Sequence, residues 1–416
     1  MVVVQIVFAG TDGTIRGRIT DVDQSPLPGA QVYIPELEQG TSANFDGNYI
    51  VLNVAVGSYD VSVNMMGYRK EIRKDVKVMM DQTVWLNFRL PVAAVEGEEV
   101  EVIGERPLVE KGTTSKKITI DKEAVEALPI RDMTELYSLQ SGVVQVIGQQ
   151  EGAIKDHEER GLQEIHVRGG RSGEIAYMID GMYIRNPIYG GIGTGTRLNL
   201  FAIKEFDWQP GGFNAEYGDA MSAVSNLHTM TGGNEFSYKF QYETSLLGAE
   251  LFNNRFDELR GYDDHNIGFG GPVPFTAGAM RFWVSSQITD NDSYRVLEFD
   301  DITYLEDDPG NAENRSNLVG PWDTYSGLRG FGFSNTGDIF AKISFQQGSA
   351  FRINATYWEV HNHLKIFDRQ FMYWDQGQNE IFRDTRRFAL EANHTISSKT
   401  FYTLRLSQFN QEAFQG

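Results

Sequence analysis

Apolar and polar residues alternate along most of the chain after residue 234. In EFSYKFQYE (235–243), Phe236, Tyr238, Phe240 and Tyr242 fall on one face of an extended strand, because successive side chains of a strand point to opposite sides. The same period of two recurs in MRFWVSSQI (280–288), DIFAKISFQ (338–346), FRINATYW (351–358), FALEANHTI (388–396) and FYTLRLSQF (401–409). This alternation predicts β-strands, and we count about seven of them in this part of the chain.

The connections between these strands alternate in length. SFQQGSAF (344–351) and HTISSKTF (394–401) leave room for tight turns only, whereas residues 292–333 form a long connection. Strands of about ten residues with short turns at one end and long loops at the other are typical of an outer-membrane β-barrel. The chain has no run of about eighteen apolar residues, so we expect no transmembrane helix.

Shorter alternating stretches occupy residues 13–91. They include the turn DQSPLPG (23–29) and the strand-like segments AQVYI (30–34), GSYDVSV (57–63) and TVWLNFRL (83–90). Their regular spacing predicts a small antiparallel β-sandwich. The apolar residues before it end in Val7-Phe8-Ala9, which fits a signal-peptidase site. We interpret residues 1–12 as the remnant of a signal peptide, with a first β-strand as the alternative.

The middle of the chain has a mixed character. Residues 92–117 carry clustered charges and read as a linker with one short strand at Glu99–Ile103. DKEAVEALP (121–129) and DMTELYSLQSG (132–142) each combine an aspartate start with a proline or glycine stop, which predicts two short helices. Residues 118–233 therefore form an α+β domain, and the whole chain is mainly β.

The charge balance and the absence of cysteine exclude several classes of function. Of the 416 residues, 37 are Lys or Arg and 57 are Asp or Glu, so the net charge is -20. A chain this acidic, with no basic stripe, is not expected to bind nucleic acid. With no cysteine, the chain cannot form disulfides or thiolate metal sites.

Two long segments resemble known domains. Residues 13–91 resemble the carboxypeptidase-regulatory-like, transthyretin-type domain through GxIxGxI (13–19), PLPGAQV (26–32), FDGNYI (45–50), VGSYDVSV (56–63) and MGY (66–68). Residues 118–233 resemble the plug domain of TonB-dependent outer-membrane receptors through IHVRGGRSGEIAYMIDGMYIRNPIYGG (165–191), FAIKEFDWQPGGFNAEYGDAMSAVSN (201–226) and HTMTGGN (228–234). The resemblance implies that residues 234–416 are the first strands of an incomplete transmembrane barrel.

The RGGR sequence at 168–171 fits two structural roles. Glycines between two arginines can cradle a phosphate, or they can allow a tight reversal between the strands EIHVR and EIAYMID. Within a plug we favour the reversal by Gly169 and Gly170, with Arg168 and Arg171 paired to carboxylates of the plug or the barrel wall. The dipeptide Asp180-Gly181 predicts an ordinary hairpin turn.

We find no enzymatic motif and expect no enzyme, cofactor or metal centre. None of the seven histidines stands in HExxH or HxxE spacing, and GxSxG and GKS/T are absent. His361 and His363 are read as a solvated loop pair rather than a chelating pair, and GIGTGT (191–196) as a loop. The acidic stretch 290–323 fits either a solvated surface loop or a calcium site.

The resemblance implies energy-coupled uptake of an unidentified extracellular ligand in the outer membrane of a Gram-negative bacterium, with the sandwich in the periplasm. The partners would be outer-membrane lipid and the periplasmic domain of TonB, with a surface lipoprotein as a further candidate. The predicted TonB-coupling segment consists of Glu98, Glu99, Val100, Glu101, Val102, Ile103 and Gly104, whose alternating valines suit strand addition. A plain interdomain linker is the alternative for this segment.

Two other functions fit the same sequence. One is a surface adhesin or secretion-linked receptor of the same architecture that imports nothing, and the other is a soluble periplasmic module of stacked β-domains.

Plugged transporters have about 22 strands. We therefore expect a curved open sheet that partly wraps the plug, and a natural product that continues for several hundred residues.

Overall fold

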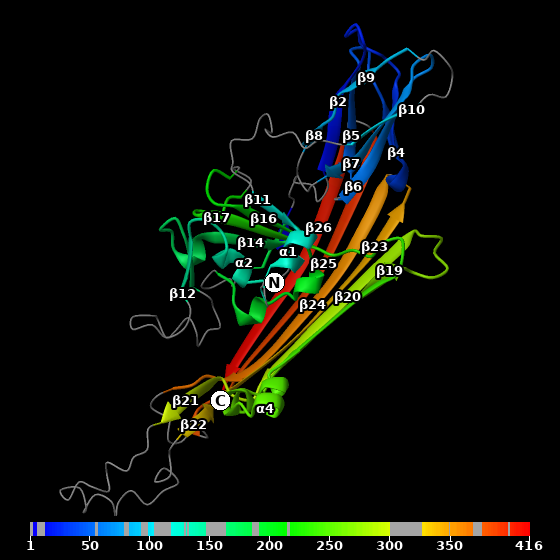
Figure 1. Ribbon diagram of the computed structural model, residues 1–416. Coiled ribbons are helices and arrows are strands. Elements are labelled where there is room, and N and C mark those ends of the chain that lie inside the picture. The colour runs from blue at the N-terminus through cyan, green and yellow to red at the C-terminus, as the bar shows by residue number, and fades with distance from the viewer. Residues whose placement is uncertain are drawn as a thin grey trace, which may run out of the picture.

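The computed structural model describes residues 3–5, 13–54, 57–78, 83–92, 99–103, 118–128, 130, 133–146, 164–184, 191–213, 217–299, 327–348, 350–368, 377–397 and 400–416. These residues form three β-rich units: an N-terminal sandwich, a plug and a tall curved sheet of long strands, which we call the wall sheet (Figure 1). No helix in the described part of the chain is long and apolar enough to cross a membrane.

The sandwich is built from two sheets. Its elements are β2 (Gly13–Asp21), β3 (Gln31–Ile34), the 3-10 turn η1 (Pro35–Leu37), β4 (Gln39–Ser42), β5 (Asn48–Val54), β6 (Gly57–Asn64), β7 (Lys70–Val78), β8 (Thr83–Trp85), β9 (Phe88–Leu90) and β10 (Glu99–Ile103). One sheet has the order β10-β7-β6-β3-β4, and the other has β5-β2-β8 with β9 also on β2. The strand pairs are antiparallel except β2–β8, β2–β9 and β7–β10. Their inward residues, such as Ile15 and Val63, form one apolar core.

The predicted strand 83–90 is broken in two at Leu86 and Asn87. The backbone N–H of Leu86 donates to the carbonyl of Arg16, and the Asn87 side chain accepts from the N–H of Arg18. A Cβ at Gly17 would lie 1.9 Å from the Leu86 carbonyl oxygen, so only glycine allows this approach.

The plug is an α+β domain. Its elements are β11 (Ile118–Asp121), α1 (Lys122–Ala127), α2 (Glu135–Ser138), β12 (Val143–Val146), β13 (Glu164–Val167), η2 (Ser172–Glu174), β14 (Ile175–Ile179), β15 (Met182–Tyr183), η3 (Thr194–Thr196), η4 (Leu200–Ala202), β16 (Ile203–Gln209) and β17 (Ala223–Thr229). The main sheet runs β11-β16-β17-β14-β15. Tyr137 of α2 packs edge-on against Tyr177, Phe206 and Trp208 at ring-centroid distances of 5.4, 5.4 and 5.6 Å, which joins the helix to the sheet.

The wall sheet contains the long strands. They are β18 (Ser237–Thr244), β19 (Tyr262–Pro272), β20 (Met280–Asn291), β23 (Phe333–Gln347), β24 (Phe351–Lys365), β25 (Ile381–Ser397) and β26 (Thr400–Gln415), each antiparallel to the next, with β1 (Val3–Gln5) added to β26. Its outer strands, β1 and β18, do not pair with each other, so the expected open sheet is confirmed. The sheet curves along the plug (Figure 1).

The two ends of the wall sheet differ. At one end are the short turns β19–β20, β23–β24 and β25–β26, and the sandwich stands against this end (Figure 1). The side-chain amide of Asn53 in β5 donates to the Thr395 hydroxyl of β25 over 2.6 Å. At the other end lie the helices α4 (Leu246–Phe252) and α5 (Arg255–Arg260) and the hairpin β21 (Arg295–Phe299) and β22 (Gly327–Phe331).

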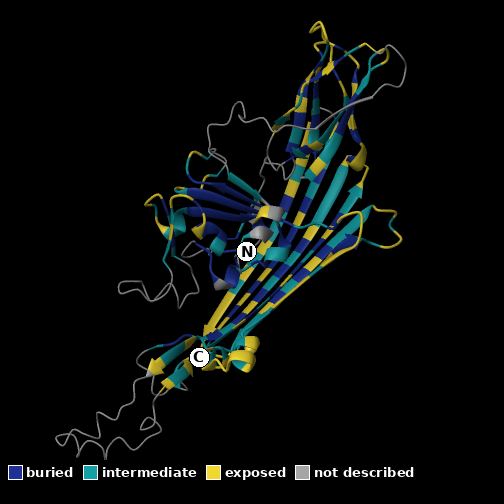
Figure 2. Cartoon of the chain, viewed as in Figure 1, coloured by how far each residue is buried: buried dark blue, intermediate teal, exposed yellow. Residues whose placement is uncertain are grey.

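Exposed and buried residues alternate along the strands of the wall sheet (Figure 2). Apolar residues point outward, with exposed fractions of 67% for Phe240 and 56% for Phe388. Polar residues point toward the plug, with 0% for Thr385, 1% for Arg387 and 7% for Lys342. An apolar exterior around a polar interior is the pattern of a transmembrane β-barrel.

Candidate functional site

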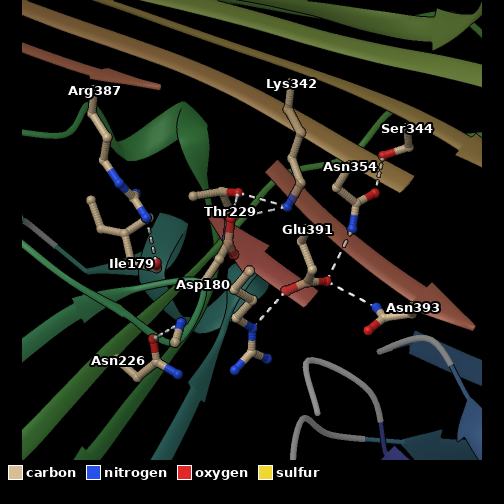
Figure 3. A network of polar contacts seen from close by, with 12 residues as sticks. Ile179, Asp180, Asn226, Thr229, Lys342, Ser344, Asn354, Arg387, Glu391 and Asn393 are labelled. Atoms are coloured by element: carbon tan, nitrogen blue, oxygen red, sulfur yellow. Dashed lines mark hydrogen bonds and ion pairs between the residues drawn. The ribbon is translucent and has the colours of Figure 1, made fainter. Parts of the chain in front are cut away.

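The plug meets the wall sheet through buried polar side chains, and we take this contact as the candidate functional site (Figure 3). The plug contributes the turn between β14 and β15. Asp180 and Gly181 both have positive φ, 50° and 71°, which is the geometry of a two-residue hairpin turn of type I′. The turn places the Asp180 carboxylate beside Thr229 at the end of β17 and against Lys342 of β23.

Asp180, Thr229 and Lys342 form a closed hydrogen-bonded group. The Lys342 ammonium lies 3.1 Å from the carboxylate of Asp180 and donates to the Thr229 hydroxyl over 2.9 Å. The backbone N–H and the hydroxyl of Thr229 donate to the two oxygens of that carboxylate over 2.9 and 2.6 Å. Each charged atom is therefore paired, as burial requires.

The electrostatics of Asp180 result from two opposing effects. Burial by itself raises the pKa of this carboxyl group, because desolvation disfavours the charged form. The Lys342 ammonium and the hydrogen bonds from Thr229 outweigh burial and hold the pKa of Asp180 well below its usual range. Asp180 is thus ionised while Lys342 is in place.

Two arginines of the wall extend this contact (Figure 3). Arg387 of β25 donates to the carbonyl of Ile179 over 3.1 Å. Arg405 of β26 donates to the Glu391 carboxylate over 3.0 Å. A Cβ at Gly181 would lie 3.2 Å from the Arg405 guanidinium, so the glycine lets this arginine pass close to the turn.

A second polar contact lies at the plug segment before η4. The side-chain amide of Asn199 donates to Asp338 of β23 over 2.5 Å, and Arg197 donates to the Thr289 hydroxyl over 2.8 Å. The indole N–H of Trp358 donates to the carbonyl of Arg197 over 3.0 Å. Apolar side chains of the wall complete the plug core nearby: Trp283, Phe340, Trp358 and Val360.

A third polar group lies inside the plug and holds its first strand. The Thr119 hydroxyl of β11 and the His228 ring of β17 both bond the carboxylate of Asp207 in β16, over 2.6 and 2.8 Å. Asp207 and His228 are buried, whereas β11 is the edge strand of the plug sheet and follows the predicted coupling segment in the chain. Displacement of β11 would break the Thr119 bond.

The RGGR loop differs from the prediction. The strands that flank it, β13 and β14, do not pair with each other, because both edges of β14 are already occupied by β15 and β17. Instead β13 pairs with β12 in a separate two-stranded sheet. Gly169 has a φ of 83°, whereas a Cβ at Gly170 would lie 2.6 Å from the Ser222 side chain. The loop therefore needs its glycines for two different reasons.

The arginines of this loop were expected to pair with carboxylates. The structure places Arg168 and Arg171 on the surface, and neither forms an ion pair with any described residue. His166 bridges the loop instead, bonding the Gly170 carbonyl over 3.0 Å and Glu164 over 2.9 Å. The hydrogen bond with Glu164, followed by that with Gly170, raises the pKa of His166.

The predicted coupling segment lies on the sandwich. Its central residues form β10 (Glu99–Ile103), which pairs in parallel with β7 at the edge of the five-stranded sheet. Glu98 and Gly104 lie outside the described residues.

On the outer face of the wall sheet, aromatic side chains give way to charged ones beside Phe388. Tyr357 of β24 and Phe388 of β25 face each other with ring centroids 4.9 Å apart. Two register positions further along the same face lies the ion pair between Glu359 and Arg386 at 2.6 Å. From Phe388 to Ile396 the strand covers about 26 Å, or roughly 20 Å along a membrane normal at the usual tilt, near the ~25 Å of a barrel's apolar band.

Among the described residues, no group of three or more histidine or acidic side chains is arranged to hold a metal ion. His361 and His363 lie in the strand β24 rather than in a loop. They bond Asp384 and Glu380, each over 2.8 Å. Most of the acidic stretch 290–323, and with it the calcium alternative, lies outside the described residues. GIGTGT contains the short 3-10 turn η3.

Sequence reasoning missed the wall residues of the site. Lys342, Arg387, Glu391 and Arg405 all lie in the predicted strands or beside them, on the polar face. The available signal was a charged residue at an inward position of a strand whose outward positions are apolar. Their plug partners are far away in sequence, 162 residues in the case of Asp180 and Lys342.

A plug bonded to the polar inner face of an apolar-faced sheet is the construction of a plugged outer-membrane receptor. Residues 15–102 match the family model of the CarboxypepD_reg-like domain, and residues 110–224 match that of the TonB-dependent Receptor Plug Domain. The chain therefore contains a CarboxypepD_reg-like domain followed by a TonB-dependent receptor plug domain. Such receptors are outer-membrane proteins of Gram-negative bacteria that interact with TonB, and they are not enzymes.

Individual relatives are distant. The TonB-dependent transporter Oar of Myxococcus xanthus is 24% identical over 229 residues, which cover 54% of this chain and 21% of Oar. Similar solved structures include the unliganded ferric citrate transporter FecA, with a TM-score of 0.48 and 11% identity over 72% of this chain and 40% of FecA. Another is the ferric yersiniabactin uptake receptor FyuA of Yersinia pestis. It has a TM-score of 0.45 and 12% identity over 72% of this chain and 41% of FyuA. The chain thus spans about a fifth of the curated relative.

Proposed function

We propose that this chain is the N-terminal part of an outer-membrane transporter that imports an unidentified extracellular ligand with energy delivered by TonB. The observation that supports this most is the plug itself, which fills the concave side of the wall sheet and is held there by hydrogen-bonded charges rather than by a covalent or disulfide link. A plug that obstructs the barrel but is held by noncovalent contacts can be displaced, and its displacement requires energy.

The polar contacts suit a plug that moves and returns. When the plug shifts, water can replace each hydrogen bond that Lys342 or Arg387 makes, so the interior groups do not stay unpaired. When it returns, the positive φ values of Asp180 and Gly181 preset the turn that presents the carboxylate to Lys342. The contacts of the site could therefore break when the plug moves and form again when it returns.

The energy would enter through the coupling segment, residues 98–104. TonB would add a strand to Glu99–Ile103, and tension would pass along the chain to β11, the edge strand of the plug sheet. Loss of β11 breaks the bond between Thr119 and Asp207 and disturbs the centre of the plug.

The test is binding of the purified periplasmic domain of TonB to the full-length receptor. Neighbouring residues of β10 direct their N–H groups to opposite edges, so Glu101→Pro and Val102→Pro are both made, and one of the two removes an N–H that strand addition needs. Affinity should fall at least about tenfold in that variant. Val102→Ala keeps the N–H and serves as the matched control. Equal affinity of both proline variants and the wild type would place the coupling segment elsewhere.

A further inference from the structure

The coupling strand occupies an edge of the sandwich. β10 pairs with β7 over five register positions, from Glu99 opposite Lys70 to Ile103 opposite Lys74. β10 is also the last strand of its sheet, so its other edge has no strand partner among the described residues. An extended strand directs its backbone groups alternately to both sides. Half of those in β10 face β7, and the other half remain free for another strand.

The charges of β10 and of its neighbour β7 favour their pairing. The segment EGEEVEVIGE (96–105) contains five glutamates and no basic residue, whereas the four basic residues of β7 outnumber its two acidic ones, Glu71 and Asp75. In the register Glu99 lies opposite Lys70. The acidic strand thus lies beside a basic one on its inner side. Because opposite charges favour pairing of neighbouring strands, the strand best suited to its free edge is also basic.

Release of β10 would be costly for the sandwich. Glu71, whose register partner is Val100, is buried and forms an ion pair with Arg73 over 2.7 Å. Removing β10 would take away the strand beside this pair and leave the edge groups of β7 unpaired. Addition of a strand to the free edge of β10 requires neither change.

We propose that the energy-coupling partner docks a basic strand on the free edge of β10 while β10 stays paired with β7. The sandwich, β10 and the partner then form one continuous sheet, and the sandwich is part of the docking surface. This inference rests on the proposed function, because it assumes that residues 99–103 receive TonB. It assigns the sandwich a role: it holds the acidic strand extended, so that the partner meets a preformed edge.

Residues 1–416 contain no cysteine, so in a full-length receptor freed of any other cysteine the pairing can be locked chemically. Ile72→Cys and Glu101→Cys place two thiols at one register position of β7 and β10, where a disulfide or a short bis-thiol reagent can join them. Affinity for the purified TonB periplasmic domain is measured on the full-length receptor before and after reduction. The pair Gln31→Cys and Ser42→Cys, at the opposite edge of the sheet, is the matched control.

The cross-link at 72 and 101 should form in the resting receptor and should change the Kd by less than about threefold. Weakening of about tenfold or more that reduction reverses would show that β10 must leave β7, and would overturn the inference. Failure to cross-link would overturn it as well. Full affinity of both Glu101→Pro and Val102→Pro would instead refute the coupling role of residues 98–104, so the two failures are distinguishable.

Discussion

Replacement of Lys342 by methionine should loosen the plug by several kcal/mol. The substitution keeps most of the side-chain volume but leaves the buried carboxylate of Asp180 without the ammonium that lies 3.1 Å away. Loss of one partner of a buried ion pair costs about 3–5 kcal/mol. The two hydrogen bonds from Thr229 remain, so we expect the lower end, about 3 kcal/mol.

Hydrogen exchange of the detergent-solubilised receptor measures this cost locally. Peptides that cover the turn at Asp180 and the end of β17 should exchange roughly 100-fold faster in Lys342→Met, since about 1.4 kcal/mol corresponds to tenfold. Lys365→Met is the control, because Lys365 pairs with the partly exposed Glu380 over 3.6 Å. That control should change protection by no more than about 1 kcal/mol.

The pH dependence gives a second signature. In the wild type the pKa of Asp180 is depressed, so its contribution to stability is present above the unfolded pKa of about 4 and is lost as the pH falls. In Lys342→Met, burial is opposed more weakly, by the hydrogen bonds from Thr229 that remain, so this pKa should rise. If it rises above the unfolded value of about 4, stability should then fall as the pH rises through that range. Asp180→Asn in that background should remove the dependence. Wild-type protection of Lys342→Met at pH 7, after correction for intrinsic exchange, would refute the reasoning.

Two further substitutions test the plug. Gly170→Val should destabilise the plug by about 1–3 kcal/mol because its Cβ would meet Ser222, and Ser222→Gly should restore part of the loss, with no change in anion affinity. Micromolar phosphate binding by the wild type that Gly170→Val abolishes would instead support the phosphate interpretation of the loop. Thr119→Val should speed exchange in β11 by roughly tenfold through loss of the hydrogen bond to Asp207, while Thr119→Ser retains wild-type protection; equal exchange in all three proteins would remove Thr119 from the coupling path.

The sequence predicts the strands well where one face of a strand is apolar and the other is polar. The stretches 280–288 and 351–358 lie wholly in wall strands, 235–243 does so from Ser237 on, and the helix expected at 121–129 contains α1 (Lys122–Ala127). The strand β19 was missed because its inward positions include Gly268 and Gly270, which show no polar or apolar pattern. Local periodicity thus finds an element only if both of its faces carry side chains of distinct character.

Pairing between distant segments was beyond prediction. The hairpin expected across the RGGR loop failed because the strand IAYMI is buried on all sides and takes β15 and β17 as neighbours. The turn at Asp180 and Gly181 could be read from two residues, but its contact with Lys342 depends on how the wall sheet curves around the plug. No local signal encodes that contact.

The proposed function requires the wall sheet to be the lipid-facing side of a membrane protein. Residues 1–416 contain no cysteine, so in a reconstituted full-length receptor from which any other cysteine has been removed, single cysteines at Arg386, Phe388, Ala389 and Leu390 of β25 can each carry an environment-sensitive fluorophore. Brominated lipids should quench the labels at 388 and 390 and spare those at 386 and 389, since apolar side chains point outward and the apolar band ends at Phe388. Labels at all four positions that respond only to an aqueous quencher would contradict the account and indicate a soluble β-module.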